Sequence, residues 1–157
     1  MEALLVGKEA PDFSLKDATG KTHSMKDIET EFIVLFFYPK DNTPGCSIEA
    51  NEFNKHLKDF SKISATVVGI SGGDEKSKEK FCRKLDLTLL LLSDTDFSVS
   101  TAYGCYKKKS FMGKSYMGIS RETFVIGPDR KVLIHYPKVN PLKHAKEVLV
   151  ELRNFVK

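Results

Sequence analysis

Residues 36–50 read FFYPKDNTPGCSIEA, and this stretch contains the end of a strand, a turn and the start of a helix. The apolar run stops at Pro39, and a short polar turn follows. Thr43 is placed to cap a helix whose first residue is Pro44, so that Cys46 falls in its first turn. Free backbone amides at a helix N-terminus stabilise negative charge, and the thiolate is the reactive form of cysteine. The stretch therefore predicts a reactive thiol on a rigid support.

The pattern after this turn predicts one helix over residues 44 to about 60. Apolar side chains recur at spacings of three and four, which places them on one helix face: Cys46, Ala50, Phe53, Leu57 and Phe60. Because Cys46 shares this face with core side chains, we expect its thiol to point into the protein. A thiolate in such surroundings needs a cationic partner.

Arg121 is our candidate for that partner, because it starts a predicted strand and its guanidinium supplies several fixed donors. Glu49, one helical turn after Cys46, is placed to orient the arginine by a bidentate contact. The spacing is equally consistent with an ordinary surface ion pair between Arg121 and Glu49, and both readings stay open here.

The remaining chain alternates strands with helices. The expected order is a hairpin ending near Met25, a buried strand 32–38, the helix 44–60, a strand 65–70, a helix 74–86, a strand 89–92, a short helix 96–103, a hairpin of strands 121–126 and 131–136, and a helix from Pro141. The last helix is expected to have a core stripe: Leu142, Ala145, Leu149, Leu152 and Val156. This order predicts an α/β sandwich around a mixed sheet, in one domain over residues 1–157.

The net charge of +4 is mild, but basic residues cluster at Lys107–Lys109, Lys114 and Arg121 with aromatic residues between them. Nucleic-acid-binding segments share this composition. We interpret the segment as a solvated loop whose aromatic side chains enter the core, since no nucleic-acid motif accompanies it. No apolar run is long enough to span a bilayer, and the first residues lack the features of a secretion signal. We expect a cytoplasmic protein with neither nucleic-acid nor membrane partners.

The chain has three cysteines, Cys46, Cys82 and Cys105. In a cytoplasmic protein, an odd number favours catalytic or redox use over a static disulfide framework. Metal-binding motifs such as C-x-x-C and H-E-x-x-H are missing from the sequence, so we expect no metal and no cofactor. A disulfide oxidoreductase of the thioredoxin type would need a cysteine at position 43, where the chain has Thr43.

The pattern Pro39-x-x-x-Thr43-x-x-Cys46 resembles the active-site signature of the peroxiredoxins. Residues 38–46 closely resemble the Q-type branch, also called bacterioferritin comigratory proteins. Further segments resemble family motifs in the same order: residues 7–15, 91–94 and 113–121. The resemblance implies a thioredoxin-like fold with an N-terminal β-hairpin extension. It also implies reduction of hydrogen peroxide and organic hydroperoxides without haem or metal.

The resemblance also implies a role for each residue of the motif. Cys46 would be the peroxidatic cysteine, which peroxide oxidises to a sulfenic acid. Thr43 and Arg121 would hold the peroxide. Pro39 would shield the pocket, and Glu49 would orient the arginine.

Ionisation of the thiol is too small an effect to explain a fast peroxidase. A thiol with an ordinary pKa of about 8.5 is roughly 3% ionised at pH 7, so complete ionisation raises the rate only about thirtyfold. The larger share is expected from donors that stabilise the charge moving onto the leaving oxygen. Arg121, the Thr43 hydroxyl and the Cys46 amide are the donors that we expect there.

A second cysteine is expected to resolve the sulfenic acid. Many Q-type relatives carry it five residues after the first, but this chain has Asn51 there. Cys82, on the predicted helix 74–86, is our candidate, because it resembles the arrangement in some Q-type relatives, whose resolving cysteine lies on this later helix. We expect Cys82 to be partly exposed and its thiolate to be favoured by nearby cations: Lys78, Arg83 and Lys84. We expect a Cys46–Cys82 disulfide to require local unwinding of the helix start and of the second helix, because Cys46 points inward.

Other readings stay open at this point. The enzyme could be a one-cysteine peroxidase resolved by an external thiol, or a peroxide sensor or holdase that uses Cys46 as a redox switch. Cys105 is expected to be a bystander. The resemblance implies thioredoxin or a glutaredoxin-like protein as reductant, and a monomer, with a weak dimer left open.

Overall fold

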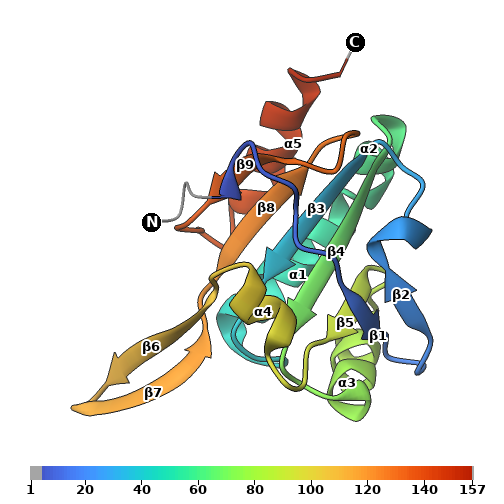
Figure 1. Ribbon diagram of the computed structural model, residues 1–157. Helices are drawn as coiled ribbons and strands as arrows, with labels where there is room; N and C mark the ends of the chain where they lie inside the picture. Colours follow the sequence, from blue (N-terminus) through green and yellow to red (C-terminus); the bar gives the residue numbers. More distant parts are fainter. Residues whose placement is uncertain (1–4, 157) are drawn as a thin grey trace.

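The computed structural model describes residues 5–156. Residues 1–4, which form most of the stretch that lacks the features of a secretion signal, lie outside this range. Figure 1 shows a mixed sheet with helices packed on both of its faces. The elements in chain order are β1 (Ser14–Lys16), β2 (Thr22–Ser24), a 3-10 helix (Met25–Asp27), β3 (Phe32–Phe37), α1 (Pro44–Lys55), α2 (Leu57–Lys62), β4 (Ala65–Ser71), α3 (Glu75–Leu85), β5 (Leu90–Ser93), α4 (Ser98–Ala102), β6 (Tyr106–Phe111), β7 (Lys114–Ile119), β8 (Glu122–Ile126), β9 (Val132–Tyr136) and α5 (His144–Arg153).

The main sheet has seven strands in the order β2-β1-β5-β4-β3-β8-β9. β3 pairs in parallel with β4 and antiparallel with β8, and β4 pairs in parallel with β5. Every residue of β3 is buried, because this strand has a neighbour on each side and helices above and below. The predicted α/β class with a mixed central sheet is confirmed.

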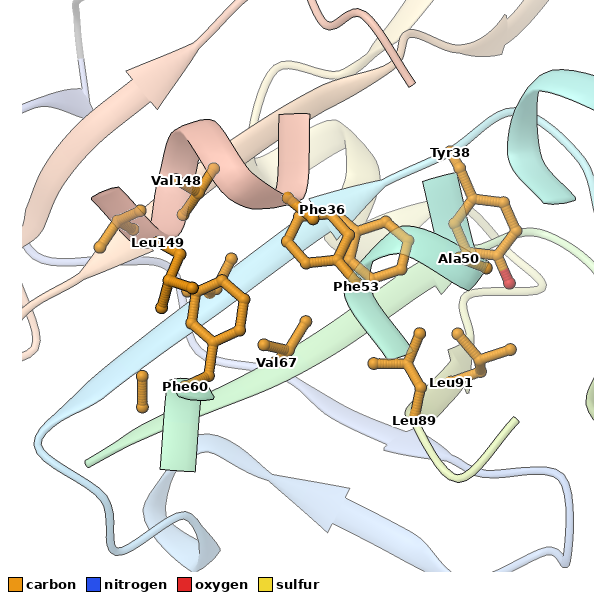
Figure 2. Close-up of a cluster of buried hydrophobic side chains, with 14 of the residues drawn as sticks. Phe36, Tyr38, Ala50, Phe53, Phe60, Val67, Leu89, Leu91, Val148 and Leu149 are labelled. Atoms are coloured by element: carbon orange, nitrogen blue, oxygen red, sulfur yellow. The ribbon is translucent and has the colours of Figure 1, made fainter. Parts of the chain in front are cut away.

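The side chains of β3 alternate between two hydrophobic clusters. Phe36 faces the cluster beneath α1, α2, α3 and α5, where its ring stacks on that of Phe53 with centroids 4.6 Å apart (Figure 2). Phe37 faces the opposite cluster, which includes Val99 of α4. This double coverage fixes the carboxyl end of β3, from which the chain turns into α1.

The prediction of a single helix over residues 44–60 is wrong, because the helix breaks at His56. That residue leaves helical geometry, with φ −102° and ψ 9°, and its amide donates to the carbonyl of Phe53 three residues earlier. α2 then places Phe60 against Phe53, with ring centroids 6.0 Å apart. Because the apolar spacing continues across His56, the sequence pattern did not indicate the break.

The predicted start of the last helix and one member of its core stripe are also wrong. Residues 141–143 form a turn in which the Asn140 side chain accepts from the amide of Leu142. Leu142 is 61% exposed, whereas His144 and Val148 are buried. The helix begins three residues later than expected because Asn140 holds this turn ahead of it.

The basic segment is a two-stranded ribbon and not a loop. Among the described strands, β6 and β7 pair only with each other, and Figure 1 shows them projecting from the body of the protein. Met112 and Gly113 close the ribbon with positive φ angles of 50° and 79°. Of the aromatic residues in and beside this segment, Tyr103 is buried in the core as expected. Phe111 and Tyr116 are 67% and 51% exposed, so the expectation is wrong for these two.

Within residues 5–156, none of the helices has the length and apolar character needed to cross a bilayer.

Candidate active site

Cys46 lies in the first turn of α1, directly after the turn that follows β3. Thr43 occupies the N-cap position and Pro44 is the first helical residue, as the sequence predicts, but within the described residues the Thr43 side chain makes no capping hydrogen bond. The carbonyl of Thr43 accepts the first helical hydrogen bond from the amide of Ser47, at 2.9 Å. The Cys46 amide therefore belongs to the orphan donors of the helix start. Cys46 is only 1% exposed, so its thiol points inward as expected.

Arg121 bridges Cys46 and Glu49. Its Nη2 atom lies 3.4 Å from the Cys46 sulfur, and its Nη1 atom lies 2.8 Å from Glu49 Oε1. Glu49 is fully buried, which rules out the alternative of a surface ion pair. The contact is single and not bidentate, because the second nitrogen of the guanidinium is directed to the sulfur. Among the described residues, Glu49 Oε2 has no hydrogen-bond partner.

Gly45 is a part of the site that the sequence analysis did not identify. A Cβ atom at this position would lie 3.0 Å from Arg121 Nη2, closer than side chains usually approach. A larger residue would therefore push the guanidinium away from the sulfur. The only signal in the sequence was the presence of a glycine beside the cysteine in the first turn of a helix. Glycine is a poor helix former, so its presence there indicates another reason, such as the need for space.

The hydroxyl of Thr43 donates to the carbonyl of Lys40 at 2.8 Å. Its proton is thus engaged, which corrects the expectation that this hydroxyl is a free donor. The oxygen keeps lone pairs that can accept from a bound hydroperoxide. Pro39 is half-buried in the same turn. The structure thus gathers Thr43, Cys46, Glu49 and Arg121 in one place, with Pro39 in the turn before them.

Burial and the neighbouring charges shift the pKa values of the ionisable groups at this site. Burial raises the pKa of Glu49 from its ordinary value of 4.5 to about 7, although Arg121 opposes the shift. Burial disfavours the charged form of Arg121, but the nearby Cys46 and Glu49 leave its pKa raised. Lys109 of β6 lies close enough for burial and Arg121 to lower its pKa. Lys109 of the ribbon thus brings a second cation near the site.

We expect Glu49→Gln to flatten the pH dependence of stability. The carboxyl of Glu49 ionises near 4.5 when unfolded and near 7 when folded, so the folded state holds its proton more tightly. The associated stability is complete below pH 4.5 and is lost as pH rises through about 7. Relative to Glu49→Gln, the wild type should lose up to about 3 kcal/mol between pH 5 and 8, since one pKa unit is about 1.4 kcal/mol.

Urea unfolding at several pH values measures this difference. Glu52→Gln is the matched control, because it removes a half-buried carboxylate from the same helix without touching Arg121. Parallel pH profiles for the wild type and Glu49→Gln would contradict the expectation.

Cys82 lies on α3 and is half-buried, as the sequence predicts. The expectation that neighbouring cations favour its thiolate is wrong. Burial and the charge of Asp41 raise the pKa of Cys82, whereas the charge of Lys78 lowers it. Lys78 is itself paired with Asp41, and Arg83 is paired with Glu79 on the exposed face of the helix.

Cys105 is buried, and its sulfur lies 3.9 Å from the carbonyl oxygen of Tyr103. Burial, and then the charge of Glu122, raise the pKa of the Cys105 thiol well above its ordinary value. These surroundings are those of an unreactive packing residue. All three cysteines are free thiols in this structure.

The fold and the site together define a class of protein. The reactive thiol starts the helix after the central strand of a mixed sheet, as in thioredoxin-like proteins. Residue 43 is not a cysteine, and an arginine faces the sulfur instead. This arrangement defines a thiol peroxidase on a thioredoxin-like fold.

Comparison with known proteins agrees with this class. Residues 6–135 match the model of the AhpC/TSA family. A putative peroxiredoxin bcp of Helicobacter pylori is 41% identical over 152 residues, which cover 97% of this chain and 100% of that protein. Peroxiredoxin Bcp of Bacillus subtilis is 37% identical over 149 residues, or 95% of each chain.

Solved structures agree as well. Peroxiredoxin Q of Xanthomonas campestris superposes with a TM-score of 0.86 at 34% identity, and the match covers 92% of each chain. The chain belongs to the AhpC/TSA family, in its Q-type (Bcp) peroxiredoxin branch. The resemblance seen at residues 36–50 is confirmed, and with it the thioredoxin-like fold and the activity of a thiol-dependent peroxidase acting on hydroperoxides.

Proposed function

We propose that Cys46 is the peroxidatic cysteine of this enzyme, with Arg121 and Thr43 as the residues that hold the peroxide. The observation that carries this proposal is the 3.4 Å approach of Arg121 Nη2 to the buried Cys46 sulfur at a helix N-terminus. The thiolate attacks one peroxide oxygen, so that an S–O bond forms while the O–O bond breaks. Cys46 becomes a sulfenic acid, and the departing oxygen takes up a proton and leaves as water or an alcohol.

Each residue around Cys46 has a separate role in this step. Arg121 and the amides of the helix start face the negative charge that moves onto the leaving oxygen. Thr43 accepts a hydrogen bond from the peroxide, which orients it for attack. Glu49 fixes the guanidinium, and Pro39 limits access of water to the turn. Organic hydroperoxides are proposed as substrates beside hydrogen peroxide, since one Xanthomonas campestris relative was studied for its alkyl peroxide reduction activity.

Cys82 is proposed as the resolving cysteine, recycled by thioredoxin or a glutaredoxin-like protein. Cys46 and Cys82 border the same hydrophobic cluster, so α1 and α3 are joined through a shared core. Two structures of the Xanthomonas campestris relative are cysteine-to-serine variants. The two substituted positions have the same separation as Cys46 and Cys82. A monomeric state is proposed from the resemblance to Q-type relatives, with a weak dimer as the alternative. A cytoplasmic location and a single domain over residues 1–157 are proposed from the sequence.

One observation favours the alternative of a one-cysteine peroxidase resolved by an external thiol. Burial raises the pKa of Cys82, which makes it a poor nucleophile in the closed structure. The intramolecular route therefore requires that the start of α1 unwinds and that the surroundings of Cys82 change at the same time.

Peptide mapping after one equivalent of peroxide distinguishes the two routes. We expect a Cys46–Cys82 disulfide with Cys105 still free, because Cys105 is buried and lies outside the proposed cycle. A lasting sulfenic acid on Cys46 together with a free Cys82 would favour the external thiol.

A further inference from the structure

The ion pair of Asp41 and Lys78 joins the two segments that carry the proposed redox cysteines. Asp41 lies in the turn between β3 and α1, five residues before Cys46, and Lys78 lies on α3, one helical turn before Cys82. Lys78 Nζ is 3.1 Å from Asp41 Oδ2, and the two side chains are 0% and 1% exposed. An ion pair this deeply buried thus holds the turn before α1 against α3.

A shell of hydrogen bonds saturates both members of the pair. Lys78 Nζ also donates to Ser71 Oγ at 2.6 Å and to the carbonyl of Gly73 at 3.2 Å. Asp41 accepts from the hydroxyls of Tyr38 and Ser77, at 2.6 and 2.7 Å. Buried ion pairs are often no more stabilising than apolar residues of the same volume. Stability alone therefore does not explain why an ion pair lies between the two segments that carry the redox cysteines.

We propose that the Asp41–Lys78 pair positions and controls the resolving cysteine. While the pair is closed, the carboxylate of Asp41 keeps Cys82 from acting. When the turn before α1 opens, it carries Asp41 away and leaves the charge of Lys78 beside Cys82. The opening that exposes the Cys46 sulfenic acid thus also activates the thiol that attacks it. This inference rests on the proposed role of Cys82.

The charges around Cys82 support this coupling. Apart from burial, Asp41 and Asp17 raise the pKa of Cys82, and Lys78 lowers it. Asp41 belongs to the turn that must move, whereas Lys78 lies on the same segment as Cys82, four residues before it. Burial lowers the pKa of Lys78, and Asp41, Cys82 and Asp74 are the groups that favour its charged form. Loss of Asp41 and loss of burial therefore both lower the pKa of Cys82.

The resolving step is balanced within the protein. The Cys82 thiolate attacks the sulfur of the Cys46 sulfenic acid, and an S–S bond forms while the S–O bond breaks. The hydroxide that leaves takes up the proton that Cys82 released and becomes water. Cys82 is oxidised and the sulfenic sulfur of Cys46 is reduced, so no external oxidant or reductant enters this step.

Alkylation of Cys82 in a Cys46→Ser background tests the electrostatic part. Iodoacetamide labelling is followed over a range of pH and quantified on the Cys82 peptide. We expect Asp41→Asn to lower the apparent pKa of Cys82 and Lys78→Met to raise it. Ser77→Ala is the matched control, since it removes a hydrogen bond to Asp41 without changing any charge, and it should leave this pKa in place. Equal shifts in Asp41→Asn and Ser77→Ala, or none in either, would overturn the proposal.

The rate of disulfide formation tests the coupling in protein that retains Cys46. After a single pulse of peroxide, Lys78→Met should form the Cys46–Cys82 disulfide about tenfold more slowly than the wild type. Asp41→Asn leaves Lys78 buried without its counter-ion, so Asp41→Asn/Lys78→Met serves as a variant with a neutral core. If the pair served only to hold the turn before α1 against α3, its removal in this double variant would ease opening, and the disulfide would form faster than in the wild type. We expect it to be slower, because the open state then lacks the charge of Lys78.

Failure of this inference differs visibly from failure of the proposed resolving role. If wild-type protein forms no Cys46–Cys82 disulfide, the role of Cys82 fails. If the wild type forms the bond and the double variant forms it equally fast or faster, only the role of the ion pair fails.

Discussion

Cys46→Ser is expected to abolish peroxide consumption, and Cys82→Ser is expected to stop it after the first equivalent. Serine lacks an ionised nucleophile at neutral pH, so the first variant should lose roughly 10⁴-fold or more in rate. The second variant keeps Cys46, Arg121 and the helix start, and it can form the sulfenic acid once. Without a resolving thiol, the thioredoxin cycle then has no disulfide to reduce.

An assay that couples NADPH oxidation to thioredoxin reductase and thioredoxin measures both effects. Turnover should be lost in both variants, whereas a single peroxide pulse should be consumed only by Cys82→Ser. Cys105→Ala is the matched control, because Cys105 is buried away from the proposed cycle, and it should keep its turnover within about twofold. Full turnover by Cys82→Ser would contradict the intramolecular route, and turnover by Cys46→Ser would contradict the assignment of the nucleophile.

The sequence predicted the parts of the fold that local patterns determine. The buried run of β3, the helix that starts at Asp74 and the hairpin of β8 and β9 were all visible, because each has its own turn or periodicity signal. The break at His56 was not visible, since the apolar spacing continues through it. The ribbon of β6 and β7 was interpreted as a loop because an exposed two-stranded arm has no buried face to create an alternating pattern.

The site was predictable where it is local and hidden where it depends on contacts between distant segments. Cys46, Thr43 and Glu49 lie on one short stretch, and their placement followed from helix geometry. Lys78 stands among several lysines of α3 and nothing in the sequence marks it as the buried one. Its burial depends on Asp41, which lies in another segment, and only the packing of α3 against the turn before α1 reveals the pair.

Arg121→Lys is expected to lower the rate constant for peroxide reduction by about a hundredfold. Removing one fixed donor that faces developing negative charge typically costs 10²–10³ in rate. Arg121 directs one nitrogen to the Cys46 sulfur at 3.4 Å and another to Glu49 at 2.8 Å, and this geometry requires a planar fork. A lysine ammonium is a single point, so it cannot keep both contacts.

The measurement must separate this loss from a change in the fraction of Cys46 thiolate. Lysine keeps the positive charge, and the gain from complete ionisation of an ordinary thiol is limited to about thirtyfold at pH 7. Stopped-flow reduction of hydrogen peroxide gives the rate, and ultraviolet titration of the thiolate in a Cys82→Ser background gives the ionised fraction. We expect the rate to fall much further than the thiolate fraction, because the guanidinium acts mainly on the leaving oxygen in the transition state. Proportional losses in both quantities would mean instead that Arg121 serves only to ionise Cys46, and that the rate of this enzyme derives from its thiolate alone.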